Sequence, residues 1–266
     1  MIGSPWGSAK YKGIIWGDSH SLHWGQLLHQ QAKKNNISLV IAPRKCPAYL
    51  NSAYIKSHYP KYPQFNKNCT FRNKATLNWL KEDDSVELVI LASAWSGQVR
   101  MHYTDEHPEN LVNTSLRNRF PKIGASLSKI AFEPLLSQLS DKKVLLLSDI
   151  PRPNKNLNEC AFAQHTQLLR QQCKPENFKI LDVKKIHQWH KSSDKMIKDV
   201  ANKFSNVSAI IPTERLCGQE YCQTYINNEL IYRDDNHIRS NLKAATVNEL
   251  AKKLSITEFF DSLTYR

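Results

Sequence analysis

The chain has 266 residues, of which 41% are hydrophobic, and a formal net charge of +13. It is long enough to bury a substantial core, and since no stretch approaches the roughly 18 consecutive apolar residues of a membrane-spanning helix, we expect a soluble polypeptide. The charge would suit an acidic partner, but the basic residues are scattered and match no recognised nucleic-acid motif, which favours a solvated basic surface and no nucleic-acid partner.

The first part of the chain, residues 1–12, is predicted to be a linker or a cloning remnant, followed by one domain over residues 13–266. The segment lacks the basic and apolar regions of a secretory signal peptide. No internal repeat or low-complexity tract divides the remainder of the chain.

An apolar run at residues 13–17 predicts a short strand that stops at a glycine, and Asp18, Ser19 and His20 follow it. A strand that ends at a turn residue lifts the next side chain out of the sheet, which is how a hydroxyl nucleophile becomes exposed. Ser19 is therefore a candidate nucleophile. The same residues also form an ordinary turn followed by a helix cap, and the motif by itself favours this structural interpretation.

Strand-like and helix-like segments alternate along the rest of the chain. In the first half of the chain, we predict a helix at 22–34, a strand at 37–42, a loop at 43–69, a helix at 71–81, a strand at 86–92, a polar turn at 93–97 and a helix within 120–139. In the second half, we predict a strand at 143–147, a loop at 154–178, a short extended segment at 180–183, a helix at 184–204, a strand at 207–211, a hairpin at 225–232 and a last helix at about 237–254.

This alternation predicts a mostly parallel sheet with helices on both faces, a three-layer α/β/α domain. Active sites in such domains lie at the carboxyl ends of the strands. Ser19, the turn at 93–97 and Asp149 each follow a predicted strand, so we expect them at the same edge of the sheet.

Six cysteines fall into three pairs that are local in the sequence, and none has the Cys-x-x-Cys spacing of a metal or thioredoxin site. Their surroundings resemble loops, which favours disulfides over buried thiols and an oxidising compartment over the cytosol. Six cysteines allow many other pairings. The predicted disulfides are Cys46–Cys69, Cys160–Cys173 and Cys217–Cys222.

A second polar motif, Asp234-Asp235-Asn236-His237, precedes the last predicted helix. The Asp-x-x-His spacing lets one loop present a carboxylate and an imidazole together, with Asp234 orienting His237 as a general base. Alone, this spacing more often marks a solvated helix start with a capping aspartate.

Together, the Gly17–His20 motif near the N-terminus and the Asp-x-x-His motif before the last helix resemble the SGNH (GDSL-like) hydrolase and acyltransferase superfamily. The resemblance implies a flavodoxin-like α/β/α fold and a catalytic triad of Ser19, His237 and Asp234. More narrowly, the chain is similar to the periplasmic SGNH domain attached to acyltransferase family 3 membrane proteins, through four stretches: Gly17–His20, Arg44–Pro47, Leu91–Trp95 and Tyr232–His237.

The chain departs from the general superfamily pattern at the oxyanion hole. No glycine occurs between Gly25 and Gly97, and the third block contains no asparagine. The backbone N–H of Ser19 can still donate to an oxyanion, and Trp95 and Ser96 are further candidates for this pocket, although a tryptophan at a strand end is as often part of the core.

The resemblance implies an O-acyltransferase, expected to be an O-acetyltransferase, that carries the acyl group on Ser19 to a hydroxyl of a cell-surface polysaccharide such as lipopolysaccharide O-antigen. An upstream membrane acyltransferase domain would deliver the acyl group, and the chain would be the soluble C-terminal domain of an inner-membrane protein in the periplasm. Arg44 and Arg100 could face an anionic acceptor, although solvated surface is the simpler interpretation.

Two alternatives remain open at this stage: a secreted carbohydrate or lipid esterase, and a catalytically weak SGNH domain that binds glycans. Neither a Gly-rich phosphate loop nor a dinucleotide fingerprint is present in the sequence, and the histidines form no recognised ligand spacing. We therefore expect no cofactor and no metal.

Overall fold

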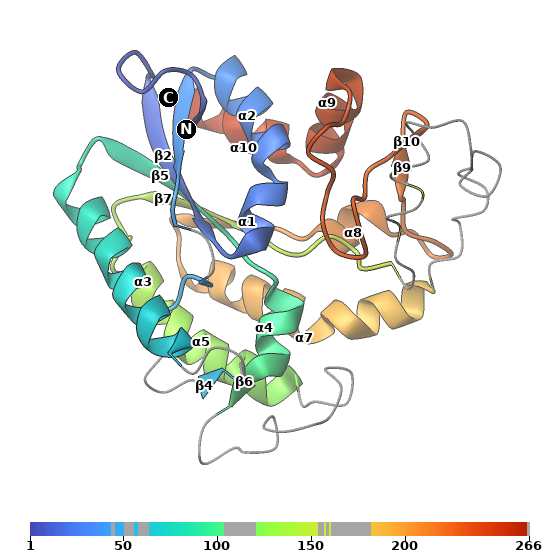
Figure 1. The fold of residues 1–266 in the computed structure, drawn as a ribbon, viewed down its shortest axis with the longest axis horizontal. Helices are drawn as coiled ribbons and strands as arrows, with labels where there is room; N and C mark the ends of the chain where they lie inside the picture. Colours follow the sequence, from blue (N-terminus) through green and yellow to red (C-terminus); the bar gives the residue numbers. More distant parts are fainter. Residues whose placement is uncertain are drawn as a thin grey trace.

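A six-stranded sheet forms the centre of the computed structural model (Figure 1). The structure describes residues 1–43, 46–50, 56–57, 64–103, 121–153, 157, 160 and 182–264. All neighbouring strands are parallel except the first pair, so the predicted mostly parallel sheet is confirmed. Across the sheet, the order is β1 (Ile2–Gly3), β3 (Ile37–Ile41), β2 (Tyr11–Gly17), β5 (Val86–Ala92), β7 (Lys143–Leu147) and β8 (Val207–Ile210).

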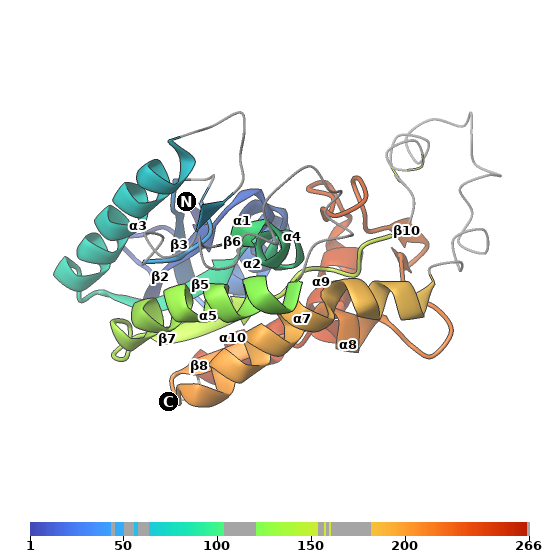
Figure 2. The same ribbon diagram turned by 90° about the horizontal axis from the view of Figure 1, so that it is seen from below.

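Helices cover both faces of this sheet, which confirms the three-layer prediction (Figures 1 and 2). Short helices α1 (Ser19–His23) and α8 (Pro212–Leu216) follow β2 and β8. Within the described ranges, no helix is both long enough and apolar enough to cross a membrane. One face carries α2 (Gly25–Lys34), α9 (Ala244–Lys253) and α10 (Ile256–Thr264), and the other carries α3 (Phe65–Glu82), α4 (Trp95–Met101), α5 (Pro121–Ser137) and α7 (Val183–Lys203).

The strands are apolar throughout because side chains on both of their faces are buried. In β2, Ile14 and Trp16 belong to the buried cluster beneath α3 and α5, while Ile15 belongs to the cluster beneath α2 and α9. This arrangement explains why continuous apolar runs, and not alternating ones, marked the strands in the sequence.

The N-terminal segment contributes to the sheet although the sequence suggested a linker. Ile2 and Gly3 pair with Leu39 and Ser38 of β3 in the antiparallel sense, and β2 begins at Tyr11. A two-residue edge strand has no periodicity by which a sequence could reveal it. The domain boundary proposed at residue 12 stays a prediction.

Several element boundaries differ from those predicted. Helix α3 begins at Phe65, so the prediction of a loop over 43–69 is wrong for its last five residues, and α9 begins at Ala244, seven residues after the predicted start. Helices α4, α8 and α10 were not predicted. Most of the predicted loop at 154–178 and part of the extended segment at 180–183 lie outside the described residues.

Short strand pairs complete the described structure. The predicted hairpin is confirmed as β9 (Tyr225–Ile226) and β10 (Glu229–Leu230), joined by Asn227 and Asn228 with φ of 49° and 58°. A second pair joins β4 (Lys56–Ser57) to β6 (His102–Tyr103).

Two of the three predicted disulfides are confirmed. Cys46–Cys69 ties the segment after β3 to α3, and Cys217–Cys222 closes the loop after α8. The prediction for Cys160 depends on Cys173, which lies outside the described residues.

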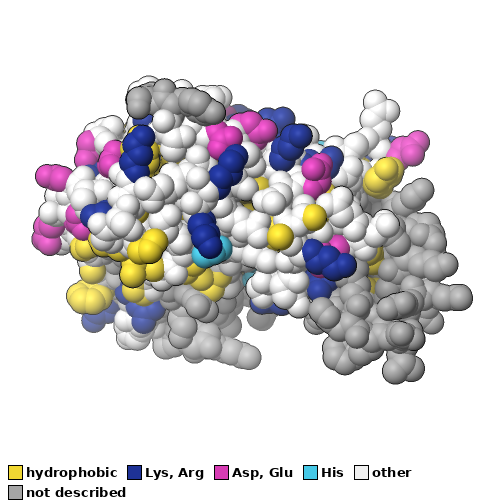
Figure 3. All heavy atoms as spheres, turned by 90° about the horizontal axis from the view of Figure 1, so that it is seen from above, with side chains coloured by type: hydrophobic (Ala, Val, Ile, Leu, Met, Phe, Trp, Pro, Cys, Tyr) yellow, Lys and Arg dark blue, Asp and Glu magenta, His cyan; other side chains and the backbone are white. Residues whose placement is uncertain are grey.

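Charged side chains are interspersed on the face drawn in Figure 3, where lysines and arginines lie among acidic residues and do not gather into one patch. This face agrees with the interpretation of the positive charge as solvated surface.

Gly17 ends β2 at a point where only glycine fits. A Cβ atom added there would lie 1.6 Å from the carbonyl oxygen of Ala92 in β5, whereas one added at Gly25 would meet nothing within 4 Å. We expect Gly17→Ala to push the two strand ends apart and to lower the free energy of unfolding by about 2–3 kcal/mol. Gly25→Ala is the matched control. Equal denaturation midpoints for the two variants would contradict this packing argument.

A buried carboxylate joins α7 to β7 and α8. Ser148 Oγ donates to Asp194 Oδ1 at 2.5 Å, and Thr213 Oγ1 donates to Oδ2 at 2.7 Å. Burial raises the pKa of Asp194 from 3.8 to about 6, although these hydrogen bonds oppose the rise. The folded protein therefore holds this proton to a higher pH than the unfolded chain does.

Because the folded-state pKa of Asp194 is raised from 3.8 to about 6, its contribution to stability falls as pH rises through this window and is level above it. The fall is expected to reach about 3 kcal/mol, and Asp194→Asn should remove it. Urea denaturation across this pH range measures the effect, with Asp84→Asn, at an exposed position in the turn before β5, as control. The same pH dependence in wild type and Asp194→Asn would refute the assignment.

Candidate active site

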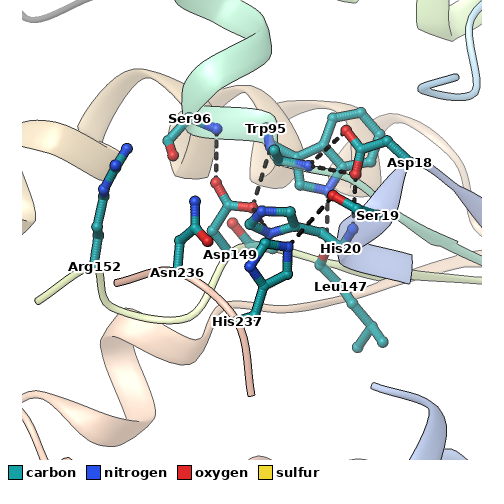
Figure 4. A network of polar contacts seen from close by, with 12 residues as sticks. Asp18, Ser19, His20, Trp95, Ser96, Leu147, Asp149, Arg152, Asn236 and His237 are labelled. Atoms are coloured by element: carbon teal, nitrogen blue, oxygen red, sulfur yellow. Dashed lines mark hydrogen bonds and ion pairs between the residues drawn. The ribbon is translucent and has the colours of Figure 1, made fainter. Parts of the chain in front are cut away.

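The carboxyl ends of β2, β5 and β7 meet at one edge of the sheet, as their parallel register requires. Ser19, the turn that begins at Ser93 and Asp149 lie there as predicted, and the loop before α9 brings His237 against them (Figure 4). Residues more than two hundred positions apart in the sequence therefore share one site.

Asp18 fixes the start of α1 beside Ser19. Its Oδ1 accepts the backbone N–H of His20 at 2.9 Å, and its Oδ2 accepts the N–H of Ala94 at 3.0 Å and Nε2 of Gln98 at 3.0 Å. Asp18 is thus the helix cap that the structural interpretation of the motif required. Ser19 is nevertheless exposed while both of its neighbours are buried, so the turn caps the helix and presents the serine at the same time.

The imidazole of His237 lies within hydrogen-bonding distance of Ser19 on one side and of Asp234 on the other. Nε2 of His237 lies 3.4 Å from Ser19 Oγ, and Nδ1 lies 3.0 Å from both carboxylate oxygens of Asp234. When Nδ1 donates to Asp234, Nε2 is left as the acceptor that faces the serine hydroxyl. A separation of 3.4 Å is common in sites without substrate, where such hydrogen bonds are long.

Asp234 is stabilised as a carboxylate. Burial would raise its pKa, but hydrogen bonds from His237, the N–H of Asn236 and the Arg233 guanidinium together hold the pKa of Asp234 well below its usual range. The backbone N–H of His237 also donates to Oδ1 at 2.8 Å. A permanent negative charge therefore faces Nδ1 of the imidazole at neutral pH.

Hydrogen bonds fix the position of the loop that carries His237. The buried Tyr232 hydroxyl donates to the carbonyl oxygen of Pro151 at 2.6 Å, and Arg152 Nε donates to Asp235 at 3.1 Å. The N–H of Arg233 closes the loop onto the carbonyl oxygen of His237 at 2.8 Å. These contacts fix the position of the imidazole relative to the end of β7.

Asp149 caps α4, whose first residues, Trp95 and Ser96, are the other candidates for the oxyanion pocket. The N–H groups of Trp95 and Ser96 donate to its two carboxylate oxygens at 3.1 and 2.7 Å. Both groups are thus occupied in this structure, and a place for Trp95 and Ser96 in an oxyanion pocket stays a prediction. Trp95 is fully buried, and its indole N–H donates to Leu147, as expected of a core tryptophan.

The backbone N–H of Ser19 differs from those of Trp95 and Ser96. It makes no hydrogen bond within the part of the chain that the structure describes, so it can donate to a substrate oxygen. The neighbouring N–H of Ala94 is already bound by Asp18. Arg44, the other basic candidate, lies outside the described residues.

Arg100 is not part of a solvated surface, and that expectation is wrong. Its side chain is buried, its guanidinium stacks 3.8 Å from the Trp189 ring, and it donates to the carbonyl oxygens of Ser96 and Trp189. Burial lowers its pKa from 12.5 to about 10. Arg100 therefore fastens α4 to α7 beneath the site.

His20 and Asp149 form a second acid–imidazole pair, which sequence reasoning missed. Nδ1 of His20 lies 3.5 Å from Asp149 Oδ1, and both side chains are buried. The sequence did place Asp149 at the right edge, because it follows an apolar strand, but no spacing linked it to a residue far away in the chain. Among the described residues, no group of three or more His, Cys, Asp or Glu side chains could hold a metal ion.

Comparisons with known proteins bear on this arrangement. The family model described as "SGNH domain (fused to AT3 domains)" matches residues 2–250. The periplasmic domain of a lipopolysaccharide acetyltransferase from Salmonella ser. Paratyphi A is similar in structure, with a TM-score of 0.55 and 14% identity over 95% of this chain and 85% of that one. No curated protein sequence matches the chain significantly.

A second solved structure, described as "a putative platelet activating factor from Streptococcus pneumonia", has a TM-score of 0.41 and 13% identity over 95% of this chain and 84% of that one, which is too weak a likeness for any argument. At 14% identity, the Salmonella structure supports the fold alone. The family model covers nearly the whole chain, and the chain therefore belongs to the family of SGNH domains that are fused to AT3 domains.

Proposed function

We propose that this chain is the acyl-transfer domain of a polysaccharide O-acetyltransferase, with Ser19 as nucleophile, His237 as general base and Asp234 as the residue that orients the base. The observation that carries the proposal is the hydrogen-bonding order of these three side chains at the edge of the sheet where the family's active site is expected. Membership of a family fused to AT3 domains supports an O-acetyltransferase-like role.

In the first step, His237 Nε2 removes the hydroxyl proton of Ser19 as Oγ attacks the carbonyl carbon of an acetyl donor. The bond to the donor's leaving group then breaks, the leaving group takes the proton from His237, and an acetyl ester remains on Ser19. Asp234 stabilises the imidazolium that exists between these two proton transfers.

In the second step, His237 removes a proton from a sugar hydroxyl, and that oxygen attacks the ester carbon of acetyl-Ser19. The ester bond to Oγ breaks, Ser19 regains the proton from His237, and the sugar leaves as an acetyl ester. In both steps the N–H of Ser19 is the donor available to the tetrahedral oxyanion, and a missing second donor would cost about a hundredfold to a thousandfold in rate.

The setting of the reaction is also part of the proposal. The membrane domain to which such SGNH domains are fused would supply the acetyl group, and the acceptor would be a cell-surface polysaccharide such as lipopolysaccharide O-antigen. Disulfides Cys46–Cys69 and Cys217–Cys222 are consistent with the periplasm as the compartment.

The exposure of Ser19 favours esterase activity as a second candidate function. Water can reach an acyl group on an exposed serine and, in the absence of a bound sugar, can take the place of the sugar hydroxyl. We therefore expect the isolated domain to release acetate slowly as well as to transfer acetyl groups.

Removal of the nucleophile or of its orienting carboxylate tests the assignment of roles. With a chromogenic acetyl ester, Ser19→Ala is expected to lower kcat/KM by about a thousandfold or more and Asp234→Asn by about a hundredfold or more, since the latter leaves the wrong imidazole tautomer. Ser262→Ala and Asp261→Asn, on the distant helix α10, are the matched controls. Losses of equal size in the controls, or none in Ser19→Ala, would rule out these roles.

The acceptor separates transfer from hydrolysis. When an oligosaccharide of the O-antigen type is added with the acetyl ester, we expect acetylated sugar to form and free acetate to fall, because both nucleophiles compete for the same acyl-Ser19. Mass spectrometry of the sugar and an acetate assay measure the two products. Acetate release that is unaffected by the sugar, with no acetylated sugar formed, would favour the esterase.

A further inference from the structure

His20 lies between a buried carboxylate and the imidazole that faces Ser19. Its ring centroid is 4.5 Å from that of His237, at an interplanar angle of 46°, and its Nδ1 is 3.5 Å from Asp149 Oδ1 on the other side. Figure 4 shows the two rings against each other, with Asp149 beside His20. The residue next to the proposed nucleophile therefore touches the proposed base.

Asp149 is held rigidly in this position. Its two oxygens also accept the N–H groups of Trp95 and Ser96, so the carboxylate cannot rotate away without uncapping α4. Burial would raise the pKa of Asp149, but His20, His190 and Ser96 lower it below its ordinary value. A fixed negative charge is thus built into the floor of the site.

The groups around His20 favour its charged form. Burial lowers the pKa of His20, but Asp149, Asp18 and Asp234 together raise it above the ordinary value of 6.5. These acids come from three different elements: the end of β7, the end of β2 and the loop before α9. The Nδ1–Oδ1 separation of 3.5 Å is an ion-pair distance without hydrogen-bond geometry, so it is the nearby carboxylates that favour the protonated form of His20 beside Asp149.

A third imidazole behind this pair is neutral. His23 is buried, its ring lies 4.9 Å from that of His20 and 5.7 Å from that of His237, and neither of its nitrogens has a hydrogen-bond partner among the described residues. Burial and the two neighbouring imidazoles hold its pKa well below 6.5. His23 therefore fills space and does not compete with His20 for the charge.

We propose that the Asp149–His20 pair is a positioning pair, in which the His20 imidazolium packs against the His237 ring and keeps that ring neutral and able to accept the Ser19 proton. The inference rests on the proposed function of Ser19 and His237. Its physical basis is that two neighbours of His237 act in opposite directions. Asp234 favours a proton on the His237 ring, and a positive charge on His20 opposes it. Without His20, the attraction of Asp234 for a proton on His237 would be offset less, with the Arg233 guanidinium on Asp234 still in place.

NMR titration of the imidazole C–H signals in the resting protein tests the pair without any need for turnover. In wild type, His20 is expected to remain protonated through the pH range in which His237 loses its proton. In both His20→Gln and His20→Phe, the midpoint of the His237 titration should rise by about half a unit to one unit. The exposed His187 of α7 provides the control, His187→Gln, and loss of a signal in His237→Gln assigns the ring.

Two results would overturn the pair. The first is a wild-type His20 that deprotonates before His237, a result that does not depend on the folding of any variant. The second is an unchanged or lowered His237 midpoint in folded His20 variants, above all in His20→Phe, since phenylalanine keeps a ring at this position and removes the charge.

The pH profile of acetyl-ester cleavage gives the matching kinetic result. In His20→Gln, kcat/KM at pH 6 is expected to fall about threefold to tenfold and to recover by pH 8.5, because His237 there needs a higher pH to become neutral. A merely structural role would lower activity equally at all pH values and would contradict the proposal. A shifted NMR midpoint together with a wild type that has no activity would instead refute the proposed function and leave the pair standing.

Discussion

Buried carboxylates that bind backbone N–H groups hold the site together. Asp18 joins the start of α1 to the turn after β5, and Asp149 caps α4 from the end of β7. Each carboxylate lies within two residues of the end of its strand, so the parallel register of the sheet sets the positions of the turns as well as those of the strands. The close approach of Gly17 to Ala92 brings the two turns within reach of Asp18.

The site contains two acid–imidazole pairs, and their environments differ. Asp234–His237 lies partly open to solvent beside an exposed serine, as acid–base chemistry requires, whereas Asp149–His20 is buried and makes its contacts within the protein. The N–H groups of Trp95 and Ser96 at the start of α4 donate to Asp149, whereas the N–H of Ser19 makes no hydrogen bond among the described residues.

The local features of the fold could be predicted from the sequence, and the contacts between distant segments could not. Apolar runs identified β5 and β7, and the Asn-Asn pair identified the hairpin, because both signals lie within a few residues. The short helix α4 was missed since its start is capped by Asp149, more than fifty residues away. The same limit applied to the site: family motifs joined Ser19 to His237, but no motif connects His20 with Asp149.

Whether Ser19 carries the acetyl group decides between this account and a domain that only binds glycans. The measurement is the mass of the protein and of its Ser19-containing peptide after brief reaction with an acetyl donor and acid quench, with a serine-reactive phosphonate as a second probe of the same hydroxyl. We expect one covalent adduct per chain, located on Ser19 and absent from Ser19→Ala. An unmodified Ser19 with both reagents, in protein that retains its fold, would contradict the account.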